Sequence, residues 1–121
     1  MKIQTIVLLA VAVASSAPVI AIAGSGPSFT AVVGSDGTLA RGRGAVSASR
    51  LGKGVYEVDF NQDVTACGYT ASVGLPGSSG VSTPGTVTVV GRSGNADALY
   101  IQTFTKRGKV LDLGFHVIVQ C

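Results

Sequence analysis

GVYEVDFNQDVTACGYTASV, residues 54–73, is the stretch that decides the fold of this chain. An apolar side chain occupies every second position from Tyr56 to Phe60, and a period of two is typical of a strand with one buried face. A second alternating run follows, with Cys67 and Tyr69 on its apolar side. The polar break between the two runs predicts a hairpin that covers a hydrophobic core.

Short apolar alternations separated by Gly, Pro, Asn and Asp continue through the rest of the chain. The expected strands lie at residues 29–33, 38–41, 45–51, 55–60, 67–73, 86–90 and 99–105, and the last is formed by 110–113 with 115–120. About eight strands at this spacing, without a helical period, predict an all-β fold, a single antiparallel β-sandwich or jelly roll. The facing of residues 99–105 stays open, because either its odd-numbered or its even-numbered side chains could enter the core.

Cys67 and Cys121 are the only cysteines of the chain. Each lies on the apolar side of an alternating run, and an even number of cysteines in an exported chain favours a disulfide over thiol chemistry. We therefore expect a Cys67–Cys121 bond that ties the last strand to the central hairpin. Two cysteines alone cannot supply the four ligands of a structural zinc site.

The N-terminal 23 residues predict a cleaved signal peptide. A lysine follows the first methionine, residues 3–14 are mostly apolar, and Ala-Ile-Ala at residues 21–23 is a small-x-small cleavage site. The β-sandwich domain is then expected to span residues 24–121. We expect a secreted product, located outside the cell, in the periplasm or at the cell surface, without a membrane partner after cleavage.

Three motifs carry a resemblance: G-x-Y-x-V-x-F at residues 54–60, V-x-x-C-x-Y-x-A-x-x-G at 64–74, and F-x-x-x-V-x-C at 115–121. With these motifs, and with DGTLARG at residues 36–42, the chain resembles a group of small exported bacterial proteins, largely uncharacterised and chiefly actinobacterial. The resemblance implies fold and export rather than chemistry, because the motif residues are core and turn positions. The Gly-x-Tyr strand and the hydrophobic closing strand also look like the trimeric jelly rolls of the complement-C1q and tumour-necrosis-factor class.

Three side chains are candidates for catalytic groups. His116 is the only histidine, and the sequence places no serine or acid beside it, as a catalytic triad would need. Glu57 and Asp59 share the outer face of one strand, about 6.5–7 Å apart at Cα, which superficially suits a pair of catalytic carboxylates. Solvated carboxylates that keep a strand soluble explain them better. We expect a non-enzymatic protein.

Four loop residues with oxygen donors could together hold calcium: Asp36, Asp63, Asn95 and Asp97. Calcium takes six to eight oxygen ligands, and the spacing of these residues does not resemble an EF-hand. Asx turns, in which the side chain accepts a hydrogen bond from a nearby backbone N–H, are the better explanation. We therefore expect neither a metal nor a cofactor.

Basic residues form two groups along the chain. The first comprises Arg41, Arg43, Arg50 and Lys53, and the second comprises Lys106, Arg107 and Lys109. If the two groups met in space, they would form a basic face able to bind wall polymers, acidic glycans or phosphate groups; a solvated surface is the alternative. The net charge of +3 is too small to predict a nucleic-acid partner, and the few aromatic residues leave no stacking platform for one.

These observations predict an exported binding module with an extracellular ligand, such as an acidic glycan or polymer, that the sequence does not identify. The alternative is a structural subunit of a self-associating, trimeric extracellular assembly, so that a homo-oligomer stays open. A small hydrolase that uses Glu57 and Asp59 is the least favoured hypothesis, because no sequence feature indicates the cleft that it would need.

Overall fold

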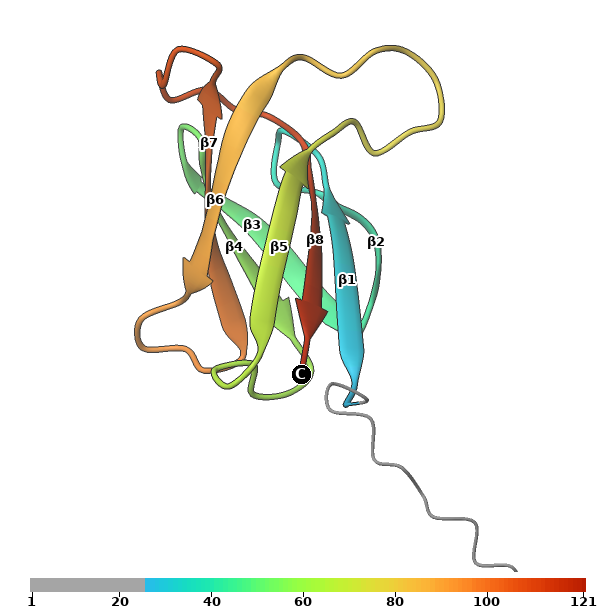
Figure 1. Cartoon of the computed structure of the whole chain (residues 1–121), viewed down its shortest axis with the longest axis vertical. Coiled ribbons are helices and arrows are strands. Elements are labelled where there is room, and N and C mark those ends of the chain that lie inside the picture. The colour runs from blue at the N-terminus through green and yellow to red at the C-terminus, as the bar shows by residue number, and fades with distance from the viewer. Residues whose placement is uncertain (1–25) are drawn as a thin grey trace, which may run out of the picture.

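A computed structural model describes residues 26–121 (Figure 1). The predicted signal peptide, residues 1–23, lies outside the described residues. Two four-stranded antiparallel sheets face each other, with strand orders β2-β1-β8-β5 and β3-β4-β7-β6. The eight strands are β1 (Ser28–Val33), β2 (Leu39–Arg43), β3 (Ala45–Gly52), β4 (Val55–Phe60), β5 (Gly68–Val73), β6 (Gly85–Gly91), β7 (Ala98–Thr105) and β8 (Phe115–Gln120). The prediction of an all-β sandwich of about eight strands is confirmed.

The core lies between the two sheets and is built from alternate residues of their strands. In β4 the buried residues are Tyr56, Val58 and Phe60, as the sequence pattern predicts. Aromatic rings bridge the sheets: Tyr56 lies 5.2 Å from Phe115 of β8, and Phe60 lies 5.9 Å from Phe29 of β1, centroid to centroid. Such tilted aromatic pairs add to the free energy that burial of their area provides.

The predicted hairpin between the two runs of residues 54–73 is wrong. β4 pairs with β3 and β7 in one sheet, whereas β5 pairs with β8 in the other. The intervening segment carries the chain between the sheets and buries Val64, whose carbonyl accepts a hydrogen bond from the Tyr69 hydroxyl at 2.6 Å. Two strands that each have one apolar face can bury those faces against each other only from opposite sheets, and this arrangement prevails over pairing of sequence neighbours.

The strands near the C-terminus settle one open question and correct one prediction. In β7 the odd-numbered residues Leu99, Ile101 and Thr103 are fully buried. Residues 110–113 do not form the expected strand; Val110 makes only an isolated bridge to Phe104. The chain departs from the sheet there because residues 111–113 form hydrogen bonds with the Thr103 hydroxyl and the Gly54 N–H, as described below.

The predicted disulfide joins Cys67 to Cys121. Gly68 and Gln120 are paired in register, so the bond links the ends of the neighbouring strands β5 and β8 within one sheet. The disulfide therefore ties β8 to its sheet neighbour β5. The expected link to a hairpin of β4 and β5 is not formed, because β4 and β5 belong to different sheets. The cysteines are 54 residues apart in the sequence.

We expect the double variant Cys67→Ser/Cys121→Ser to lose about 4 kcal/mol of unfolding free energy, because the unfolded chain regains the entropy of an open loop. Urea unfolding followed by circular dichroism measures this loss. Reductant should lower the wild-type midpoint in the same way and leave the variant unchanged. An equal midpoint for both proteins without reductant would contradict the prediction.

Phe115→Ala should cost about 3–5 kcal/mol of unfolding free energy, since it removes a fully buried ring that contacts both sheets. Ile118→Ala is the matched control in the same strand, because Ile118 faces outward and is 50% exposed. Its cost should stay below about 1 kcal/mol. Similar costs for the two variants, measured by urea unfolding, would show that the facing of β8 is wrong.

Candidate functional site

Four connections gather at one end of the sandwich, the upper end in Figure 1, which we call the loop end. They join β1 to β2, β3 to β4, β5 to β6, and β7 to β8, and comprise residues 34–38, 53–54, 74–84 and 106–114. The connections at the other end, which we call the base end, join β2 to β3, β4 to β5, and β6 to β7. Loops on a rigid scaffold are where binding residues concentrate, so the loop end is the first place to look for a site.

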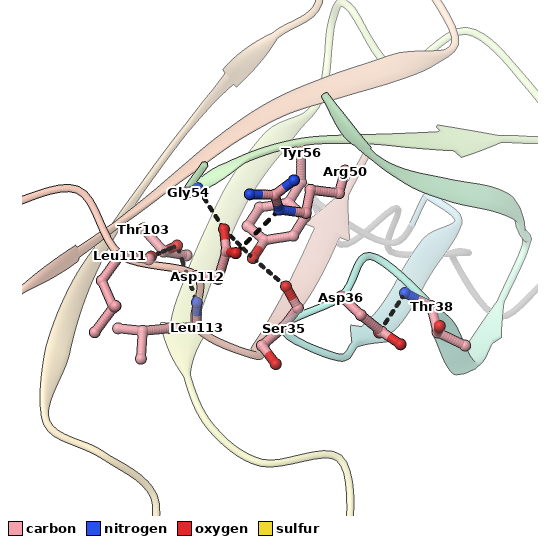
Figure 2. A network of polar contacts seen from close by, with 10 residues as sticks. All are labelled: Ser35, Asp36, Thr38, Arg50, Gly54, Tyr56, Thr103, Leu111, Asp112 and Leu113. Carbon is pink, nitrogen blue, oxygen red and sulfur yellow. Dashed lines mark hydrogen bonds and ion pairs between the residues drawn. The ribbon is translucent and has the colours of Figure 1, made fainter. Parts of the chain in front are cut away.

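The carboxylate of Asp112 joins several of these connections (Figure 2). Its Oδ1 accepts a hydrogen bond from the backbone N–H of Gly54 at 2.6 Å, and its Oδ2 lies 3.0 Å from Nε of Arg50. The Tyr56 hydroxyl lies 3.4 Å from Oδ1 and donates to the Ser35 carbonyl at 2.6 Å. One acidic side chain thus connects β3, β4 and the β7–β8 connection, and Tyr56 adds the β1–β2 turn.

Thr103 holds the neighbouring part of the β7–β8 connection. Its fully buried hydroxyl donates to the Leu111 carbonyl at 2.5 Å and accepts from the Leu113 N–H at 3.3 Å. Gly54 faces the same segment with a φ of +64°, and a Cβ at this position would lie 2.8 Å from the Thr103 carbonyl oxygen. Only glycine combines this conformation with so close an approach.

Two pKa values report the electrostatics of this network. The hydrogen bond from Arg50, followed by that from the Gly54 N–H, lowers the pKa of Asp112 below its usual value of 3.8. Burial, followed by the nearby charge of Asp112, raises the pKa of Tyr56 from 10.0 to about 12. Asp112 therefore stays ionised and Tyr56 stays neutral across the ordinary pH range.

Beside the network lies a cavity of about 420 Å³, between the β1–β2 turn, the β5–β6 loop and the end of the β7–β8 connection. Asp36 and Asp112 both line it. Both carboxylates already have partners within the protein. Asp36 accepts a hydrogen bond from the Thr38 N–H at 3.0 Å in an Asx turn, and Asp112 forms an ion pair with Arg50. Both acids that line the cavity are therefore already bound by the protein itself.

The four oxygen donors proposed for calcium are separated. Asp36 lies at the loop end, whereas Asp63, Asn95 and Asp97 lie in connections of the base end. Asp63 accepts the Thr65 N–H at 2.8 Å, and Asn95 accepts the Asp97 N–H at 3.2 Å. These are the Asx-type contacts that the sequence suggested. Within residues 26–121, His, Cys, Asp and Glu form no group of three or more suited to a metal ion.

The catalytic candidates also have separate partners. Glu57 lies 2.8 Å from Nε of Arg92, and Asp59 accepts hydrogen bonds from Ser47 and Asn95. His116 Nε2 lies 2.9 Å from the carbonyl oxygen of Leu75.

The first basic group is spread over both sheets. Arg41 and Arg43 belong to β2, and Arg41 donates to the Pro76 carbonyl at 2.5 Å. Arg50 is bound to Asp112, as described above. Lys53 lies near the second group, because the adjacent Gly54 is close to Val110, which follows Lys109.

The second basic group lines a hollow of about 350 Å³ at the loop end, opposite Thr83 and Pro84 of the β5–β6 loop. Its lysines and arginine, and Lys53 as well, are exposed and form no ion pair within the part of the chain that the structure describes. The base end instead carries three aspartates, Asp59, Asp63 and Asp97. Among the described residues, Arg43 is the one cation at this end that is not part of an ion pair. The sandwich therefore has a basic loop end and an acidic base end.

Sequence reasoning did not identify the roles of Tyr56, Asp112 and Thr83. The signal for Asp112 was its place as the one acid between the basic turn and the apolar last strand. No sequence signal marks Thr83, because its place in the hollow depends on how the β5–β6 loop folds.

A pH series should reveal the role of Tyr56. Its pKa is higher in the folded state, so its contribution to stability is complete below about pH 10 and is lost as the pH rises toward about 12. The wild type should therefore lose unfolding free energy over this interval faster than Tyr56→Phe, as measured by urea unfolding. At neutral pH the variant should be about 1 kcal/mol less stable, because the Ser35 carbonyl loses its donor. Parallel pH curves for the two proteins would refute this role.

Comparisons with known proteins do not extend the assignment. No protein-family model, no curated protein and no solved structure matches this chain. The resemblance to small exported bacterial proteins therefore rests on the quoted motifs. Among residues 26–121 there is no helix long and apolar enough to cross a membrane.

Proposed function

We propose that the chain is an exported, non-enzymatic binding module that holds an anionic partner at its loop end. The observation that carries this proposal is the hollow lined by Lys106, Arg107 and Lys109, with Lys53 beside it. Four exposed cations that form no ion pair with any carboxylate of residues 26–121 are available for charge-assisted hydrogen bonds to phosphate, sulfate or carboxylate groups.

The surroundings of the hollow support this proposal. The base of the β7–β8 connection is fixed by Asp112 and Thr103, so the basic turn projects from a rigid support. Thr83 adds a neutral hydrogen-bonding group on the opposite wall. A binding site held in place before its ligand arrives loses less conformational entropy on association.

Export and the absence of catalysis have their own support. The signal-peptide pattern of residues 1–23 and the Cys67–Cys121 bond both fit an oxidising compartment outside the cytosol. The side chains weighed as catalytic groups are engaged elsewhere: Glu57 with Arg92, and His116 with a backbone carbonyl.

Binding of inorganic polyphosphate, a chemically defined polyanion, tests the proposal. The triple variant Lys106→Gln/Arg107→Gln/Lys109→Gln should bind roughly ten-fold or more weakly at low salt, because it loses three charge-assisted contacts. Fluorescence anisotropy with labelled polyphosphate gives the dissociation constants. Wild-type affinity should also fall as salt is added.

Arg107→Gln and Arg43→Gln form a matched pair, since each removes one exposed charge, at the loop end and the base end respectively. Only the loop-end variant should weaken binding. Equal losses would mean that binding follows net charge and not a site. Failure of the wild type to bind polyphosphate at low salt would refute the proposed function.

A further inference from the structure

Exposed apolar side chains are concentrated at the loop end. Among the described residues seven large hydrophobic side chains are exposed, and four belong to this end: Leu51 (45%), Leu75 (43%), Val81 (92%) and Val110 (42%). Val110 and Leu51 flank the basic residues: Val110 follows Lys109, and Leu51 precedes Lys53 by two positions. The loop end is thus apolar as well as basic.

Val81 is the most exposed of these residues and belongs to the β5–β6 loop, which projects beyond the strands at the upper end of Figure 1. The loop folds back on itself there. Gly80 adopts a φ of +86°, and a Cβ at its position would lie 3.6 Å from the Leu75 side chain. Leu75 therefore lies close to the turn at Gly80 that precedes Val81.

The start of this loop is held on the outer face of the sheet. His116 binds the Leu75 carbonyl and Arg41 binds that of Pro76, at 2.9 and 2.5 Å. Val32 lies between His116 and Arg41 in the strand register and is only 8% exposed although it points outward. The loop segment therefore covers Val32, and the apolar turn extends from an anchored base.

We propose that the loop end docks on an anionic membrane surface, with its cations on the lipid headgroups and the side chains around Val81 in the interface. This inference rests on the proposed function, because it names the anionic partner of the same site. Aliphatic side chains contribute little to binding a soluble polyanion. At a membrane with acidic lipids, by contrast, both the aliphatic side chains and the cations make the binding free energy more favourable. The acidic membrane surface repels the aspartates of the base end, and this repulsion orients the molecule with its loop end toward the membrane.

This partner differs from the expectation drawn from the sequence, which was that no membrane is involved after signal cleavage. That expectation considered spanning and lipid-anchored segments. A peripheral contact of a folded domain depends on which exposed residues share one end, and only the fold places residues 51–53, 81 and 106–110 at the same end of the sandwich.

Cosedimentation with vesicles tests the docking proposal. The probe is phosphatidylcholine mixed with phosphatidylglycerol, and phosphatidylcholine alone is the neutral reference. Val81→Ser should reduce partition into the acidic vesicles about five- to ten-fold, because it removes buried aliphatic surface. Val46→Ser is the matched control: Val46 is 63% exposed and lies at the start of β3, at the base end. Its effect should stay below about two-fold.

Two further arms separate the sources of binding. Arg107→Gln should reduce vesicle partition about five-fold, and Arg43→Gln should not. Val81→Ser should leave the affinity for soluble polyphosphate unchanged, because that probe has no apolar phase.

The outcomes distinguish the two proposals. Equal vesicle binding by Val81→Ser and Val46→Ser, or polyphosphate binding without vesicle binding, would overturn membrane docking and leave the proposed function intact. Failure to bind either probe would overturn both. If light scattering shows an oligomer that Val81→Ser dissociates, and vesicles do not bind, then a second copy covers the apolar turn and membrane docking is wrong.

Discussion

The contact between Tyr56 and Phe115 is the interaction on which most of this structure depends. The two rings meet across the interface of the sheets, 5.2 Å apart, and so set the facing of β4 and β8, the strands that organise each sheet. The same tyrosine extends its hydroxyl out of the core to Ser35 and toward Asp112. The packing of the interior and the shape of the loop end are therefore determined by one side chain, whose apolar part and polar tip serve different regions.

The sequence pattern predicted which side chains are buried more reliably than which strands are neighbours. Alternation around Tyr56 and Phe115 identifies inward positions because the side chains of a strand point to opposite faces in turn. Pairing is not a local property. β4 and β5 are close in the chain and separated by a polar break, as a hairpin would be, yet the need to bury both apolar faces places them in different sheets. Similarly, the facing of β7 could be settled only by its neighbours β4 and β6.

Less of the candidate site could be predicted. The basic residues are visible in the sequence, but whether a cation is free depends on carboxylates and carbonyls far away in the chain. Arg50 is bound to Asp112, 62 positions later, and Arg41 to the carbonyl of Pro76, 35 positions later. The late basic turn forms no ion pair within the described residues, and it is this second basic group that lines a hollow. The Asx-turn interpretation is confirmed for Asp36, Asp63 and Asn95, whose hydrogen bonds span only two residues.

The pairing of the first strand with the last has a consequence for when this domain can fold. β1 aligns with β8 from Ser28↔Gln120 to Val33↔Phe115, and among the described strands β8 is also the one neighbour of β5 in its sheet. One sheet is therefore incomplete until nearly the whole domain has been synthesised, and folding has to close a loop that encloses most of the chain. Topologies dominated by such distant contacts fold slowly, in milliseconds to seconds. A chain of this design cannot complete that sheet while it is being made, a property compatible with the export proposed above.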